Sequence, residues 1–148
     1  MKFVIAPQSF KGSLTGKMAA KAIEQGVLSV YPTATTVLIP IADGGDGTLG
    51  VLHDNGIIDV FSSKVTGPIN QTVTAKWGVM SDGTTAVIEL AQASGLALVP
   101  HKNRDPRTTT SVGTGELFRI VLDRGHKKVV LFLGGSATND AGAGLLRA

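Results

Sequence analysis

The N-terminal part of the chain alternates between apolar and amphipathic segments in an order that few folds accommodate. Residues 2–6 and 36–41 are short apolar runs of the kind found in buried strands. Between them, apolar residues at helical spacing predict a helix over residues 16–30, with Ser13 or Thr15 as its N-cap. A strand, a helix and a strand in this order form a βαβ unit with parallel strands. The pattern therefore predicts an α/β fold, in which ligands bind beyond the carboxyl ends of the strands.

The middle of the chain follows a strand pattern of another kind. Residues 59–65, 71–79 and 84–90 carry β-branched side chains in alternation with other residues. The turn signals Gly67-Pro68 and Asp82-Gly83 separate these segments, which is typical of strands joined by short connections. The segments therefore predict an antiparallel meander, unlike the parallel unit before it.

This change of pattern predicts two domains, both with α/β architecture. Residues 1–65 are expected to begin a Rossmann-like parallel three-layer domain, and residues 66–148 to begin a second mixed α/β domain that is truncated at its C-terminus. Within the second domain, residues 91–112 are mostly loop. A helix over residues 114–124 then leads to a buried strand at 129–133.

Composition excludes several classes of protein. Hydrophobic residues make up 43% of the 148 residues and charged residues 17%, which is typical of a globular domain. The net charge of +3 is mild and no basic stripe is interleaved with aromatic residues, so no nucleic-acid partner is expected. The lack of cysteine excludes disulfides and thiolate metal sites. No apolar run is long enough for a membrane span or a secretory signal, so the cytoplasm is the expected location.

Glycine-rich loops follow the predicted strands at residues 6–13, 42–48 and 134–140. Glycine lets backbone amides approach a ligand closely, and amides at the start of a helix attract anions. Because such loops leave the carboxyl ends of strands, we expect them to converge on one crevice. In the first loop, Ser9 and Ser13 are candidates for binding phosphate. In the third loop the candidates are Gly134, Gly135, Ser136, Thr138 and Asn139.

Charged residues in the first two loops have two interpretations each. Lys11 could neutralise phosphate charge, or it could be a solvated surface lysine. Asp43 and Asp46 could hold Mg²⁺, which prefers carboxylate and phosphate oxygens. They could equally belong to an Asp-Gly turn, with Asp46 capping a helix that ends at Asn55-Gly56. Asp140 in the third loop could bind a cation or a hydroxyl.

Two further segments carry candidate site residues. Arg104, with the hydroxyls of Thr110 and Ser111, could clamp a carboxylate or a phosphate. The alternative is a threonine-rich helix start in which Glu116 supplies negative charge to the first turn. Glu89 ends an apolar strand, where it is either a site carboxylate or an edge-strand charge.

Several well-known catalytic motifs are missing from the sequence. The histidines lie apart, without the spacing of zinc ligands or of a catalytic triad. Neither the phosphate-binding loop motif nor the complete dinucleotide-binding glycine motif occurs. A P-loop NTPase, a protein kinase and a standard Rossmann dehydrogenase are therefore not expected.

The same loops give the chain a resemblance to the type I glycerate kinase family. The matching segments, in the family's order, are residues 6–13, 40–48, 65–68, 93–96, 104–106, 110–117 and 134–140. The resemblance implies phosphoryl transfer from Mg·ATP to a hydroxyl of D-glycerate, giving 2- or 3-phosphoglycerate. It also implies a cytoplasmic enzyme of two α/β domains with a cleft between them.

On the residues and the resemblance together, the predicted site has four groups of residues. Lys11, Asp43 and Glu89 are the catalytic candidates. The candidates for binding nucleotide or phosphate are Ser9, Ser13, Gly134, Gly135, Ser136, Thr138 and Asn139. The candidates for binding the substrate are Arg104, Thr110 and Ser111. Asp43 and Asp140 are the candidate ligands of Mg²⁺.

The chain also departs from the family's pattern. Gln8 stands where the family usually has Asp, Asp46 where it has Glu, and Ala141 where it has Gly. Family enzymes continue well beyond this length, so the chain resembles their N-terminal part. Two alternatives therefore remain: a catalytically silent chain that keeps its ligand-binding loops, or a kinase for another small hydroxy acid. Homo-oligomerisation is left open.

Overall fold

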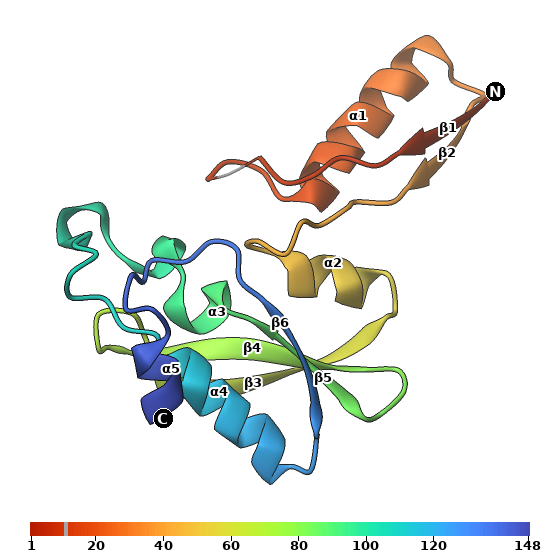
Figure 1. The fold of residues 1–148 in the computed structure, drawn as a ribbon. Helices are drawn as coiled ribbons and strands as arrows, with labels where there is room; N and C mark the ends of the chain where they lie inside the picture. The colour runs from red at the N-terminus through yellow and green to blue at the C-terminus, as the bar shows by residue number, and fades with distance from the viewer. Residues whose placement is uncertain (11) are drawn as a thin grey trace. The chain divides into compact units, whose positions relative to one another are not determined.

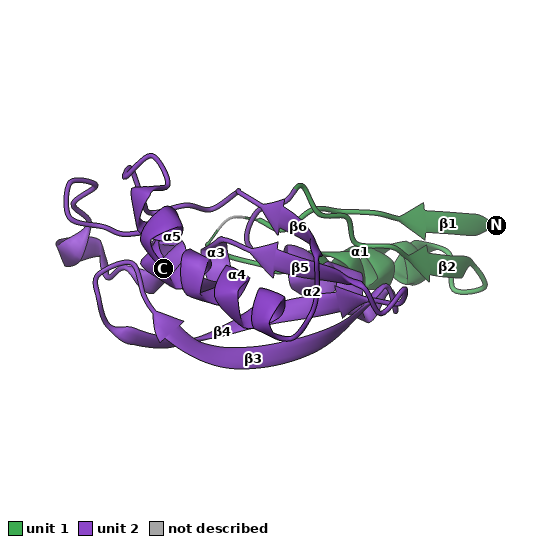
Figure 2. Cartoon of the chain, turned by 60° about the horizontal axis from the view of Figure 1, so that its bottom comes forward, with its two compact units in different colours: residues 1–43 green, residues 44–148 purple. Residues whose placement is uncertain are grey.

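The computed structural model describes residues 1–10 and 12–148, which divide into two compact units, Met1–Asp43 and Gly44–Ala148 (Figures 1 and 2). The expected boundary at residue 65 instead falls inside strand β3 (Ile58–Thr66). That strand pairs along its whole length with the next one, so the chain does not divide there. The architecture is mixed α/β, as predicted, while the division of a whole protein into two domains stays a prediction.

The first unit is the predicted βαβ unit. Strand β1 (Lys2–Ile5) pairs in parallel with β2 (Thr35–Leu38), and helix α1 (Gly16–Val30) connects them. Thr15 caps the helix, because its hydroxyl accepts a hydrogen bond from the Met18 amide at 3.2 Å. The helix and the parallel pairing predicted from the sequence are therefore confirmed.

The second unit is built on a mixed sheet in the order β3-β4-β5-β6. Strands β3, β4 (Thr72–Met80) and β5 (Thr85–Glu89) form the predicted antiparallel meander. Strand β6 (Lys128–Phe132) then pairs in parallel with β5. The carboxyl ends of β5 and β6 consequently meet at one edge of the sheet, and the loops that follow them start side by side.

Helices cover both faces of this sheet (Figure 1). Helix α4 (Val112–Asp123) packs on one face, where Ala86 and Ile88 of β5 join its core. Helix α2 (Thr48–Asp54) packs on the other face, against Val87 of β5. Because β5 is buried on both faces, its carboxyl end is rigidly placed between two cores.

The segment between β5 and α4 is more structured than its sequence predicts. It contains the short helix α3 (Ala91–Ser94) and the 3₁₀ turns η1 (Leu96–Leu98) and η2 (His101–Asn103). Such short turns lack the periodicity that identifies longer helices. Helix α5 (Ala143–Arg147) follows β6. Within the described residues, no helix combines the length and the apolarity that crossing a bilayer requires.

Candidate functional site

Two of the predicted glycine loops meet within the second unit. The Gly134 amide, just beyond β6, donates a hydrogen bond to the Gly44 carbonyl at 2.9 Å. A Cβ added at Gly134 would lie 2.5 Å from the Cα of Gly45, and one at Gly135 would lie 2.5 Å from Oδ1 of Asp46. Gly135 also has a φ of +74°. Glycine is therefore required at this crossing both for space and for backbone conformation.

Glu89 lies under this crossing with no exposed surface. Its Oε1 accepts a hydrogen bond from the Gly47 amide at 3.0 Å and its Oε2 one from the Leu49 amide at 2.9 Å. The Gln92 side chain donates a third, at 3.2 Å. Glu89 thus caps the start of α2. The sequence predicted Asp46 as the possible cap, but no side chain at the N-cap of this helix makes a capping hydrogen bond. The interpretation of Glu89 as an edge-strand charge is wrong, because β5 lies between β4 and β6.

The tip of the third loop presents hydroxyl groups to solvent. The Ser136 and Thr138 hydroxyls lie 2.9 Å apart, and the Thr138 amide donates to the Ser136 hydroxyl at 3.0 Å. The base of the loop is fixed, since the Ala137 amide donates to the Ser94 carbonyl at 2.9 Å. Ser136 and Asn139 are exposed. A fixed base with exposed hydroxyl and amide groups suits the predicted binding of an anionic ligand.

Asp140 anchors this loop to the start of α4. Its Oδ2 accepts hydrogen bonds from the amide and the hydroxyl of Ser111, both at 2.8 Å, and from the Gly144 amide at 3.2 Å. Its Oδ1 accepts one from the Gly142 amide at 3.1 Å. Burial raises the pKa of Asp140, but these hydrogen bonds outweigh it and hold the pKa below its usual value. Of the two carboxylate oxygens of Asp140, Oδ1, with its single recorded donor, retains more capacity to bind a cation than Oδ2.

Ser111 serves this anchor rather than facing solvent. Its side chain is 2% exposed, and its hydroxyl, besides donating to Asp140, accepts a hydrogen bond from the Leu145 amide at 2.9 Å. Thr110 is also engaged: its amide donates to the Pro68 carbonyl at 2.9 Å, and its hydroxyl accepts from the Val112 amide at 3.3 Å. These predicted substrate ligands therefore already hold several bonds within the protein.

The predicted arginine fork lies on an exposed segment. The Arg104 side chain is exposed, and its Nε donates to the Val99 carbonyl at 3.4 Å. Arg107 forms an ion pair with Asp105 at 2.7 Å. This guanidinium lowers the pKa of the Asp105 carboxyl. Arg104 consequently has more freedom than Arg107 to reach an anionic ligand.

The remaining predicted residues belong to the first unit. Ser9, Ser13 and Asp43 are exposed. Lys11 lies outside the described residues. Their participation in a site together with the loops of the second unit stays a prediction.

Several polar residues behind the loops have structural roles that were not predicted from the sequence. The hydroxyls of Ser94 and Thr114 lie 2.8 Å apart, both fully buried, and join α3 to α4. Gln92, which holds Glu89, likewise had no assigned role. Their only signal in the sequence is that they are polar side chains in otherwise apolar or glycine-rich segments.

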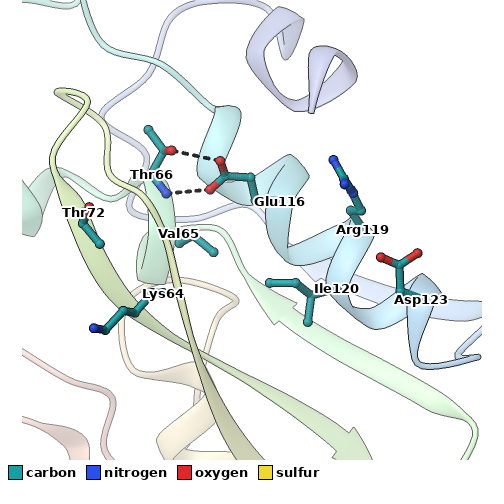
Figure 3. Close-up of a pocket in the computed structure, with 8 residues that line it drawn as sticks. All are labelled: Lys64, Val65, Thr66, Thr72, Glu116, Arg119, Ile120 and Asp123. Atoms are coloured by element: carbon teal, nitrogen blue, oxygen red, sulfur yellow. Dashed lines mark hydrogen bonds between the residues drawn. The ribbon is translucent and has the colours of Figure 1, made fainter.

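A pocket of about 490 Å³ lies between β3, β4 and α4 (Figure 3). Glu116 lines it without acting as a first-turn charge, because its carboxylate accepts hydrogen bonds from the amide and the hydroxyl of Thr66 at 2.6 and 2.9 Å. None of the lining residues is a predicted site residue; they are Lys64, Val65, Thr66, Thr72, Glu116, Arg119, Ile120 and Asp123.

The oxygen donors that this chain offers a divalent cation are its carboxylates. Within residues 1–10 and 12–148, no group of three or more His, Asp or Glu side chains could together hold a metal ion. Mg²⁺ does not require such a group, because it commonly binds one or two carboxylates together with water and substrate phosphates. The exposed Asp43 and Asp46 have suitable chemistry, whereas Asp140 is largely used in anchoring.

Comparison with known proteins gives one consistent result. A model described as the glycerate kinase family matches residues 3–148. The chain is 51% identical over 148 residues to a glycerate kinase of Bacillus subtilis (strain 168), covering 100% of this chain and 39% of that protein. It is 48% identical to a glycerate 2-kinase of Escherichia coli (strain K12), with the same coverage.

The solved structures give the same result. A structure of a glycerate kinase 2 from Salmonella typhimurium LT2 superposes with a TM-score of 0.75 at 47% identity, covering 100% of this chain and 40% of that chain. The chain therefore spans about two fifths of the length of the relatives it matches, at 39% and 40%.

Proposed function

Because the chain belongs to the glycerate kinase family, we propose that it transfers the γ-phosphoryl group of ATP to a hydroxyl of D-glycerate. The reaction depends on positioning and on neutralising phosphate charge, with little covalent chemistry for the protein to perform. Glycine loops, a lysine, an arginine and carboxylates are the groups that such a reaction uses. The Escherichia coli relative is named a glycerate 2-kinase, which favours 2-phosphoglycerate as the product.

One observation carries the proposal: the two glycine loops cross at the carboxyl ends of β5 and β6. The hydrogen bond from Gly134 to Gly44 and the close approach of Gly135 to Asp46 make this crossing compact. The carboxyl edge of parallel strands is where α/β proteins bind ligands. The hydroxyls of the exposed Ser136 and the half-buried Thr138 lie on one of these loops and can donate to phosphate oxygens.

The remaining roles follow from residue chemistry. Lys11 would neutralise charge on the transferred phosphoryl group, with Ser9 and Ser13 as further phosphate donors. Arg104 would bind the glycerate carboxylate. Asp43 would orient the attacking hydroxyl or hold Mg²⁺, with Asp46 as a second oxygen donor. Bound Mg²⁺ would supply charge neutralisation at the phosphate oxygens.

The proposal is tested by measuring ADP formation from Mg·ATP in the presence of D-glycerate. The assay is run on the chain and on a chimera in which the chain replaces the matching part of the Bacillus subtilis relative. Glycerate-dependent ADP formation in either protein supports the proposal. A folded chimera that forms ADP only with another small hydroxy acid would change the substrate, and one that forms none would contradict the function.

A further inference from the structure

Glu89 is the most deeply buried carboxylate among the described residues, with no exposed surface. Burial of such a group costs several kcal/mol unless hydrogen bonds replace the lost water. All its recorded partners are donors: the amides of Gly47 and Leu49 and the side chain of Gln92. No exposed atom remains with which Glu89 could touch a ligand, so its contribution must act through the residues it holds.

Those residues belong to the loop at the crossing described above. Gly47 directly follows Asp46, whose Oδ1 lies against Gly135. Gly47 has a φ of +90°, and no side chain of its own turn caps α2, so the Glu89 carboxylate supplies the bonds that fix this conformation. Because β5 is buried on both faces, the backbone of Glu89 is held firmly in the sheet, and its carboxylate fixes the loop relative to that sheet.

We infer that Glu89 is a positioning residue: its carboxylate fixes residues 44–48 against the Gly134–Gly135 turn and so sets the placement of the exposed Asp46 carboxylate. Neither catalysis by Glu89 nor a purely stabilising role describes this arrangement. The inference rests on the proposed function, since the loop matters for activity only if the crossing binds the reacting groups. A displacement of reacting groups by about 1 Å lowers turnover on the order of 10²-fold.

The test compares Glu89→Gln with the matched variant Glu116→Gln. Each change replaces one carboxylate oxygen by an amide group that cannot accept a hydrogen bond. Glu116 is the matched control because its carboxylate also accepts hydrogen bonds from a backbone amide and from a second donor. Both donors belong to Thr66 on β3, not to the loop that Glu89 holds. Gln92→Leu is a milder third variant, because it removes only one of the three donors to Glu89.

Three quantities are measured on the full chain: amide hydrogen exchange at Gly47 and Leu49, kcat, and KM for D-glycerate. In Glu89→Gln we expect exchange at these amides to accelerate on the order of tenfold or more. We expect kcat to fall about 10²-fold with little change in KM. Glu116→Gln should leave exchange at these amides and kcat unchanged, and Gln92→Leu should give smaller changes in the direction of Glu89→Gln.

Equal kcat in Glu89→Gln and Glu116→Gln, or unchanged exchange at Gly47 and Leu49, would overturn the inference. If the unmodified chain forms no phosphoglycerate, the proposed function fails separately. Exchange and the affinity for Mg·ADP, measured by calorimetry on the same variants, then decide the role of Glu89. A loss of affinity in Glu89→Gln, with a smaller loss in Gln92→Leu and none in Glu116→Gln, supports positioning, whereas equal affinity in all variants, or no affinity in the unmodified chain, contradicts it.

Discussion

Replacing Asp140 by alanine tests whether this carboxylate anchors the third loop. The carboxylate accepts hydrogen bonds from the amide and the hydroxyl of Ser111 and from the amides of Gly142 and Gly144, at 2.8 to 3.2 Å. A hydrogen bond to a charged group contributes roughly 1.5–3 kcal/mol when buried. Because Asp140 is partly exposed and water replaces some of these bonds, we take about 1 kcal/mol for each of them. Asp140→Ala should therefore lower the free energy of unfolding by about 3–4 kcal/mol.

The assay is urea unfolding in metal-free buffer containing a chelator, supported by thermal unfolding. The loss corresponds to a decrease in Tm of roughly 6–16 °C for a chain of this size. Asp105→Ala is the matched control, because it removes a carboxylate whose recorded partners are Arg107 groups on an exposed segment. It should leave the midpoint unchanged. A metal-free Asp140→Ala chain as stable as the unmodified one would refute the anchoring role and favour the metal-ligand prediction for Asp140.

Three more predictions concern Ala141, Asp140 and the first two glycine loops. Ala141 has a left-handed φ of +51°, which costs an L-residue about 1–2 kcal/mol. Glycine relieves this cost but loses more backbone entropy on folding, so Ala141→Gly should raise the free energy of unfolding by about 0.5–1 kcal/mol. Urea unfolding measures the change, and a lower midpoint would contradict the prediction. Since folding lowers the pKa of Asp140, its stabilisation should be complete above its unfolded pKa of about 3.9 and be lost as the pH falls through the lowered value. Unfolding midpoints from pH 7 to pH 2 should show that loss in the unmodified chain and less of it in Asp140→Ala. Lys11→Ala and Asp43→Asn should each abolish phosphoryl transfer in the chimera with unchanged circular dichroism, and near-normal turnover would remove that residue from the mechanism.

The elements predicted well are those whose signals are local. The helix over residues 16–30 has its periodicity, its cap and its stop within the segment itself, and the structure gives the same bounds. The antiparallel meander of β3, β4 and β5 was equally predictable, because its turns carry the signals Gly67-Pro68 and Asp82-Gly83. Helix α3 was missed because Ala91–Ser94 is too short to show a period.

From the sequence, the candidate site could be predicted only as a set of loops. Convergence of the glycine loops was predicted, but their contact within the second unit was not, because residues 42–48 had been assigned to the first domain and the two loops follow strands of different sheets. The role of Glu89 was not readable, because its partners Gly47 and Leu49 lie 42 and 40 residues away in sequence. The same holds for Asp140, whose anchor Ser111 is 29 residues away and had been assigned to the substrate. Such pairings depend on tertiary structure, so spacing along the chain does not reveal them.

The central claim is best tested by phosphorus NMR of the chain, and of the chimera, mixed with Mg·ATP and D-glycerate. The account predicts a phosphoglycerate resonance that grows as the γ-phosphate resonance of ATP declines, with the chemical shift of 2-phosphoglycerate. Unchanged ATP in the presence of a folded chimera would contradict it.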